Sequence, residues 1–488
     1  MKRLNCLLII FTIALLAIYS CSKEDDKSNF DSKNYPEEVG RIMVEKCATA
    51  GCHNEQSKLA AGGLSLSSWD QLFEGSRAGS SVIPYRADQS YLLFSINTYP
   101  SLGVTLSPTM PFNDNPLSSE EYTVIKDWII AGAPNKDGVV KFSNDPERRK
   151  IYVANQGCDM IAVFDANSKI LMRYIDVGSK EEIELPRQVK VAPNGKYWYS
   201  IFFSNSIIQK YDAMDDQLIG EVELGIGNWN SFSISSDSKY GYIINWSDNG
   251  SIAIVDLETM QLANKYEGSG LFELPFGSFV NGSNNMLYVT AQHGNFIYKV
   301  DITNQDIPII EKVSLNGVSP TTISWLNPSK IVMSPDESNY LVTCEESNEV
   351  RILSTEDDSL IAIIPTGNLP QEMAVSQSSP YVFVTCTEDI SSFPGKTGSV
   401  HIIDYSNHTL VKTLHTGYQP HGIVVDDKEQ LVYVAHRNMN SDGPAPHHQT
   451  DCDGRNGYVA IIDLNTLELL PDYKVEVSVD PYSVSLRD

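Results

Sequence analysis

Two cysteines and the histidine directly after the second one are the residues whose spacing points most clearly to chemistry. Cys47, Cys52 and His53 form the pattern C-x4-C-H within VEKCATAGCHN. Two such thiols can add to the vinyl groups of haem, and the adjacent imidazole is then placed under the iron as a ligand. The segment therefore predicts covalent haem c with His53 as the proximal ligand.

A second ligand is expected further along the chain, at Met110. A thioether is a common partner of histidine on haem iron, and Met110 stands with Pro111 just before a segment that reads as a helix. Ligation by both His53 and Met110 leaves no open coordination position on the iron. Such a haem transfers electrons and is not itself a catalyst.

Two helices are expected to position these ligands. The first precedes Cys47 and has Val39, Ile42 and Met43 on one face. The second opens with a capping box formed by Ser118 and Glu121, and it ends near Gly132. Its apolar face carries three residues: Ile125, Trp128 and Ile129.

Two other interpretations of the same residues exist. Cys47 and Cys52 could form a disulfide in an exported domain, with Met110 as an ordinary core residue. A structural zinc site would have three nearby ligands where four are usual. Neither interpretation accounts for the adjacency of Cys52 and His53.

The combination resembles the small cytochrome c domains of secreted planctomycete and Bacteroidota proteins over residues 36–138. The resemblance is based on K-C-x4-C-H followed by Met110-Pro111 and a helix ending in W-I-x-x-G-A. It implies thioether attachment through Cys47 and Cys52, with His53 and Met110 as axial ligands. The usual spacing of this motif is C-x2-C-H, and the departure bears on attachment efficiency rather than on ligand identity.

Residues 149–488 carry short alternating strands in a repeat of about 42 to 53 residues, the range of propeller blades. Seven units can be counted, and the C-terminal PYSVSLRD provides a strand that the first unit lacks. The pattern resembles YVTN-repeat seven-bladed β-propellers. The expected fold is thus a small all-α cytochrome c domain followed by an all-β propeller closed by its last strand. Six aspartates that end strands are expected to cap turns: Asp165, Asp212, Asp256, Asp301, Asp404 and Asp463.

The central channel of the propeller is a candidate second site. Residues after the proline of several repeats should face it: Arg187, Phe276, Gln371, His421 and Tyr482. Equivalent strand ends add Cys344, Cys386 and His436, and the long insertion of the seventh repeat adds His447, His448, Asp451 and Cys452. One interpretation is a copper site formed by Cys344, Cys386, His421 and His436. The other is a disulfide between Cys158 and Cys452, with Cys344 and Cys386 buried or paired.

Export is indicated by the first residues of the chain. Residues 1–20 form a basic start and an apolar run typical of a signal peptide, and Cys21 follows as in a bacterial lipobox. Residues 21–35 then form an acidic tether. We therefore expect a lipid on Cys21 that anchors the protein to the bilayer of the bacterial outer membrane, and the acidic segment after it is compatible with exposure at the cell surface.

Charge excludes one class of partner. Acidic residues outnumber basic ones 62 to 36, so the surface would repel phosphate backbones, and nucleic acid is not expected to bind. The acidic surface suits a positively charged redox protein. Three functions remain open: an electron-transfer lipoprotein whose propeller docks a partner, a redox enzyme with a metal or cofactor site at the propeller channel, and a surface adhesion module.

Overall fold

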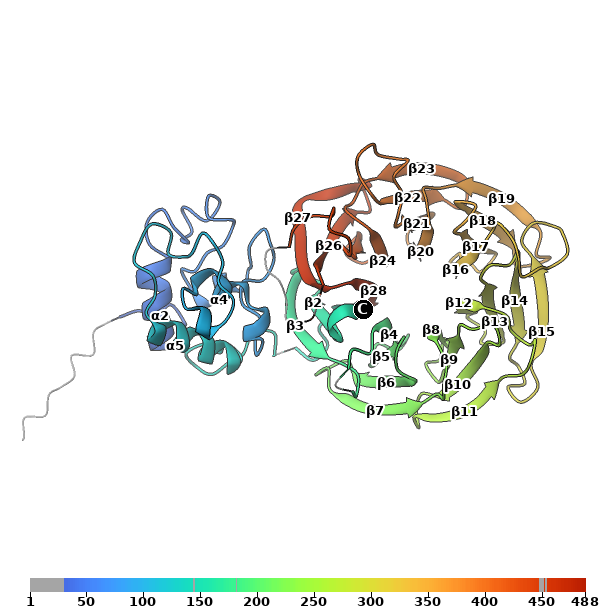
Figure 1. Cartoon of the computed structure of the whole chain (residues 1–488), viewed down its shortest axis with the longest axis horizontal. Helices are drawn as coiled ribbons and strands as arrows, with labels where there is room; N and C mark the ends of the chain where they lie inside the picture. Colours follow the sequence, from blue (N-terminus) through green and yellow to red (C-terminus); the bar gives the residue numbers. More distant parts are fainter. Residues whose placement is uncertain (1–29, 144, 181, 447–451, 453) are drawn as a thin grey trace, which may run out of the picture.

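The computed structural model describes residues 30–143, 145–180, 182–446, 452 and 454–488. The predicted signal peptide, Cys21 and most of the predicted tether lie outside these residues, as do His447, His448 and Asp451. Within the described residues, seven four-stranded antiparallel sheets form a closed ring (Figure 1). The seven-bladed propeller predicted from the repeat is thereby confirmed. No helix in this part of the chain is long and apolar enough to cross a membrane.

The blades follow one another around the ring, and the strands of each are given from the inner one to the outer one. Blades one to three consist of β28 (Pro481–Arg487), β1 (Lys150–Asn155), β2 (Met160–Asp165) and β3 (Ile170–Asp176); β4 (Pro186–Val191), β5 (Tyr197–Phe202), β6 (Ile207–Asp212) and β7 (Leu218–Glu223); and β8 (Trp229–Ile234), β9 (Tyr240–Asn245), β10 (Ser251–Asp256) and β11 (Gln261–Tyr266). Blades four and five consist of β12 (Pro275–Val280), β13 (Met286–Ala291), β14 (Phe296–Asp301) and β15 (Ile309–Ser314); and β16 (Pro328–Met333), β17 (Asn339–Cys344), β18 (Glu349–Ser354) and β19 (Leu360–Pro365). Blades six and seven consist of β20 (Pro370–Val375), β21 (Tyr381–Cys386), β22 (Ser399–Asp404) and β23 (Thr409–Leu414); and β24 (Pro420–Asp426), β25 (Leu431–His436), β26 (Asn456–Asp463) and β27 (Glu468–Val479).

The C-terminal strand closes the ring as expected. β28 pairs antiparallel with β1, and Val484 lies opposite Val153 in this pairing. Closure removes the free inner edge that β1 would otherwise present to solvent. Each of the six strand-ending aspartates accepts hydrogen bonds from backbone N–H groups of the following turn, and Asp256, for example, accepts from Glu258 and Thr259. Their predicted structural role is confirmed.

Residues before the propeller form an N-terminal part with its own hydrophobic core, which includes Tyr35, Met43, Trp69, Ile125 and Ile129. Its helices are α2 (Glu37–Ile42), η1 (Met43–Cys47), α3 (Trp69–Leu72), η2 (Ala87–Gln89), α4 (Tyr91–Ile96), η3 (Pro100–Leu102) and α5 (Ser119–Ile130). The two expected helices are present: α2 continues into η1 and buries Val39, Ile42 and Met43, while α5 begins with the Ser118–Glu121 capping box.

The expectation of an all-α domain is met only in part, because most of the N-terminal part is irregular and no separate all-α domain is delimited. The long connections are held by side chains that bond to nearby backbone. Asn54, for example, accepts hydrogen bonds from the N–H groups of Gln56 and Ser57. Asparagine and serine side chains compete with helical hydrogen bonds in this way, so these segments form turns instead.

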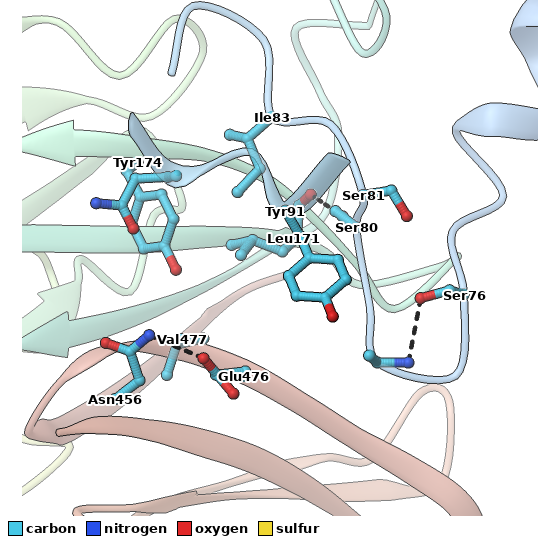
Figure 2. A pocket seen from close by; sticks show the side chains of 12 residues that line it. Ser76, Ser80, Ser81, Ile83, Tyr91, Leu171, Tyr174, Asn456, Glu476 and Val477 are labelled. Carbon is cyan, nitrogen blue, oxygen red and sulfur yellow. Dashed lines mark hydrogen bonds between the residues drawn. The ribbon is translucent and has the colours of Figure 1, made fainter. Parts of the chain in front are cut away.

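The N-terminal part contacts the outer strands of blades one and seven (Figures 1 and 2). Ile83 joins the apolar core shared by these two blades, and Ser80 Oγ donates to the Leu171 carbonyl at 2.5 Å. Arg86 forms an ion pair with Asp176 at 2.7 Å. Gly79 has φ of +102°, and a Cβ there would lie 2.7 Å from Val475 Cγ1, so the close approach requires glycine.

Candidate functional site

The residues of the C-x4-C-H motif lie in one compact turn that follows η1. Cys47 ends η1, the Cys52 N–H donates to the Thr49 carbonyl at 3.0 Å, and the His53 N–H donates to the Cys47 carbonyl at 3.1 Å. Both thiols are free, and burial raises the pKa of Cys47 to about 12 while Cys52 is exposed. The alternative disulfide between them is therefore not formed.

The His53 imidazole is held within this turn. The Leu66 N–H donates to the His53 carbonyl at 2.8 Å and fixes the backbone. The ring nitrogen Nδ1 is buried and has no hydrogen-bond partner among the described residues. Burial lowers the pKa of His53, so the ring is neutral at neutral pH. A neutral imidazole is the form that ligates iron.

Met110 is held in place by a backbone hydrogen bond to α4. Its N–H donates to the Ser95 carbonyl at 2.8 Å, which ties it to α4. Met110 and Cys47 are both half-buried and pack against the same N-terminal core. Two apolar side chains on the ligand-bearing segments are strongly exposed: Leu59 at 73% and Phe112 at 61%.

These observations fit haem c. The donor set offers two free thiols, a neutral imidazole whose buried Nδ1 has no partner among the residues that the structure describes, and a thioether on the same core. The exposed Leu59 and Phe112 are the kind of apolar surface that an apolar macrocycle would cover. If haem is bound, Cys47 and Cys52 would hold it, and His53 and Met110 would ligate its iron.

The four residues predicted as a copper site occupy separate surroundings. The described residues contain no group of three or more His, Cys, Asp and Glu side chains placed to hold a metal ion. Cys344 and Cys386 are buried free thiols, and burial raises the pKa of each to about 12. Burial lowers the pKa of His436 to about 3; its ring stacks on Tyr458 at 4.5 Å. The copper site stays an untested prediction.

The insertion of the seventh blade carries a disulfide. Cys158, after β1, and Cys452 are bonded across the junction of blades one and seven, with their Cα atoms 5.4 Å apart. Ser478 Oγ lies 2.9 Å from the Cys158 sulfur. The predicted pairing of these two cysteines is confirmed.

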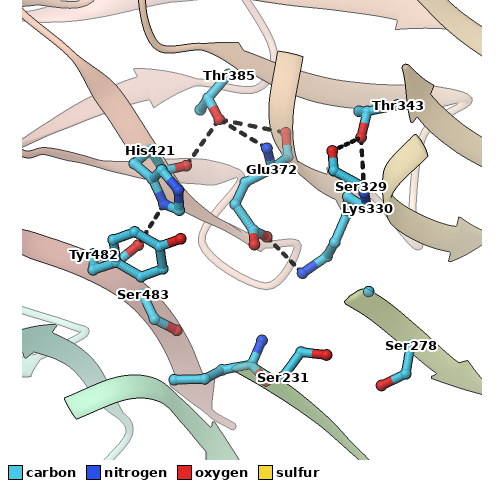
Figure 3. Close-up of polar contacts among 12 residues, drawn as sticks. Ser231, Ser278, Ser329, Lys330, Thr343, Glu372, Thr385, His421, Tyr482 and Ser483 are labelled. Carbon is cyan, nitrogen blue, oxygen red and sulfur yellow. Dashed lines mark hydrogen bonds and ion pairs between the residues drawn. The ribbon is translucent and has the colours of Figure 1, made fainter. Parts of the chain in front are cut away.

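The channel is polar and charged (Figure 3). Four of the residues expected there line it: Arg187, Phe276, Gln371 and Tyr482. The fifth, His421, is buried beside them, and its ring lies 3.8 Å from that of Tyr482 with Nδ1 2.8 Å from the Tyr482 carbonyl.

Apart from Arg187, sequence reasoning missed the charged residues at this channel. Lys330 and Glu372 point toward each other in Figure 3 and form an ion pair at 2.5 Å. Glu345, just after β17, is buried, and burial raises its pKa to about 7 against hydrogen bonds that lower it. Burial lowers the pKa of Lys190 to about 7. Lys330 and Glu372 stand two residues after the proline of their repeats, so a longer count from each proline would have found them.

No protein-family model matches the chain, and no curated protein matches it. Among solved structures, hydrazine synthase of Kuenenia stuttgartiensis is similar, with 17% identity over 64% of this chain and 92% of that chain and a TM-score of 0.50. A functionally unknown protein from Desulfotomaculum acetoxidans is also similar, with 13% identity over 69% of this chain and 98% of that one and a TM-score of 0.52. At these identities the similarities establish the propeller fold and nothing more.

Proposed function

We propose that this protein is an exported lipoprotein that transfers electrons through one covalently bound haem c. The observation that carries the proposal is the turn of Cys47, Cys52 and His53, in which two free thiols precede a neutral imidazole whose buried Nδ1 has no hydrogen-bond partner in the described part of the chain. Bound haem c would supply a one-electron redox couple.

The protein's own residues have distinct roles in this proposal. Cys47 and Cys52 would form the covalent attachment to haem, and the hydrogen bond from the His53 N–H to the Cys47 carbonyl holds the imidazole in the same turn. With haem bound, Met110 would supply the second side-chain ligand to its iron. With His53 and Met110 both ligating the iron, the site would exchange electrons with a partner rather than bind a substrate.

A small redox protein with a positive surface is the proposed partner. The excess of 62 acidic over 36 basic residues would attract such a protein by long-range electrostatics. We further propose that lipid on Cys21 anchors the protein to the outer membrane. Electron transfer to a cationic partner should slow steeply as salt is added, whereas a salt-independent rate would contradict this choice of partner.

The test of haem binding is expression in cells able to mature cytochromes c, followed by a denaturing gel stained for haem. Cys52→Ala should weaken or abolish the covalent stain. Cys344→Ala removes a buried free cysteine of the propeller and is the matched control, so its stain should equal that of the wild type. Met110→Ala should keep the stain but lose the optical band of methionine ligation. Wild-type protein without covalent haem would refute the proposal.

A redox enzyme acting at the propeller channel is the second candidate function. It is favoured by Glu345, a buried carboxyl whose pKa of about 7 suits proton transfer at neutral pH. Elemental analysis of the native protein separates the two functions. An electron carrier should hold one iron per chain, whereas an enzyme that uses a second metal should hold that metal in stoichiometric amount.

A further inference from the structure

Two cations on β4 lie at the channel: Arg187 lines it, and Lys190 is close enough to Lys330 and Glu372 of the lining for their charges to shift its pKa. Arg187 donates from Nε to Asn230 Oδ1 at 3.0 Å, and the Lys190 ammonium lies 5.6 Å from the centre of the Phe232 ring. Among the described residues, neither has a carboxylate oxygen within ion-pair distance. Asn230 and Phe232 both belong to β8, so the two cations extend from blade two toward blade three.

Two further cations, one in the lining and one beside its residue Tyr482, are paired. Lys330 pairs with Glu372 at 2.5 Å, and Arg437 pairs with Asp480 at 2.6 and 2.9 Å. In a chain with 62 acidic residues, carboxylates are plentiful, so two neighbouring unpaired cations stand out. Desolvating a charge without a counter-ion is costly, and a bound anion would offset that cost.

The donors match a particular anion geometry. The Arg187 guanidinium lies 4.1 Å from the centre of the Tyr482 ring, and its Nε is already used by Asn230. Its two Nη groups remain as a planar pair of donors, which suits two oxygens of one anion. Lys190 adds a compact point charge from the same strand. The lining leaves room only for a small molecule, because Gln371, Tyr482 and Ser483 close around the same space.

We propose that the propeller channel binds a small oxyanion, either a carboxylate or an inorganic oxyanion, between Arg187 and Lys190. Lys330, on the far side of the channel, adds positive potential that Glu372 partly cancels. This site is formed by the propeller alone and goes beyond the proposed electron transfer. It should therefore bind its anion whether or not haem is attached to the N-terminal part.

Protonation is coupled to this binding. Burial lowers the pKa of Lys190 to about 7, Lys330 lowers it further, and Glu372 opposes the shift. An anion beside Lys190 favours its charged form, so binding above pH 7 must take up a proton. Glu345 also weakens anion binding above pH 7. It loses its proton near pH 7 and then places a negative charge near Arg187. Burial together with Arg437 and Arg187 lowers the pKa of His421 well below its usual value, so His421 stays neutral.

The experiment is calorimetric titration of the full chain with acetate and, separately, with sulfate, at several pH values in the Glu345→Gln background. The dissociation constant should rise about tenfold per pH unit above about pH 7, with uptake of up to about one proton. Lys190→Arg keeps its charge at high pH and should make the affinity nearly independent of pH. Binding of acetate alone or of sulfate alone also supports the proposal, and it shows whether the ligand is a carboxylate or an inorganic oxyanion.

Variants complete the test. Arg187→Ala and Lys190→Met should each weaken binding about tenfold or more. Lys312→Met, on the outer strand β15, is the matched control and should leave the dissociation constant unchanged. Cys52→Ala, which lacks the haem attachment, should bind as the wild type does. No saturable binding of either probe, or binding that Arg187→Ala and Lys190→Met leave intact, would overturn the proposal.

Discussion

Removing the disulfide between Cys158 and Cys452 should destabilise the propeller markedly. The bond joins residues 294 positions apart and therefore constrains most of the unfolded propeller chain. The chain-entropy relation gives a ceiling of about 5 to 6 kcal/mol for a loop of this length. Measured effects usually fall below that ceiling, so we expect a loss of about 2 to 4 kcal/mol in the free energy of unfolding.

The assay is urea unfolding of the oxidised protein and of Cys158→Ala/Cys452→Ala, followed by tryptophan fluorescence. Trp198 and Trp229 are fully buried in blades two and three and report on the propeller core. Reduced wild type serves as the control, because it loses the bond but keeps both sulfur atoms. The urea concentration at the unfolding midpoint should fall by the same amount in the double variant and in the reduced wild type. A change below about 0.5 kcal/mol in the free energy of unfolding of both would refute the claim that the disulfide stabilises the propeller by constraining its unfolded chain.

Three further predictions concern stability. Ile83→Ala should destabilise the contact of the N-terminal part with blades one and seven by about 2 to 4 kcal/mol, seen as faster proteolytic separation, whereas the exposed Ile130→Ala should not. Asp426→Asn should cost about 3 kcal/mol in thermal unfolding, because it leaves Arg149 buried with only peripheral partners; the exposed Asp31→Asn should cost under 1 kcal/mol. Burial lowers the pKa of His436 to about 3, so below about pH 6.5 the unfolded chain binds a proton on His436 that the folded chain does not. The free energy of unfolding should therefore fall as pH drops below about 6.5, by up to about 1.4 kcal/mol per pH unit, and His436→Gln should flatten that slope.

The propeller was predictable because its signals are local and repeated. Alternating apolar residues and a polar turn recur in each blade, and a strand-ending aspartate recurs in six of the seven. The spare strand at Pro481–Arg487 indicates how the ring closes. The disulfide between Cys158 and Cys452 belonged to one of two interpretations of the propeller's cysteines. Choosing between them required the distance between two loops that are far apart in sequence.

The channel was only partly predictable, because the inner strands are irregular where they begin. The pairing of β4 with β5 shifts register between Pro186 and Gln188, and that of β16 with β17 shifts between Pro328 and Ile331. A β-bulge changes which side chains face the channel after it. Counting from each proline therefore found Arg187 and missed Lys190 and Lys330.

The residues of the haem motif were predictable as a set, but their surroundings were not. Helices α2 and α5 follow from apolar periodicity and a capping box, and both are present. The turn that follows Cys47 and the segment that carries Met110 have no such periodicity. Their shape depends on individual bonds such as that from the Met110 N–H to Ser95, which sequence patterns do not encode.

Three separate contacts meet where blade one adjoins blade seven. β28 pairs with β1, Cys158 bonds to Cys452, and the segment around Ile83 packs on the core of both blades. A ring of blades opens most readily where its first and last strands meet, because only non-covalent pairing closes it there. The disulfide thus restrains the same junction on which the N-terminal part rests. Reduction should accordingly loosen the N-terminal part as well as the ring, and faster proteolytic separation after reduction would reveal that coupling.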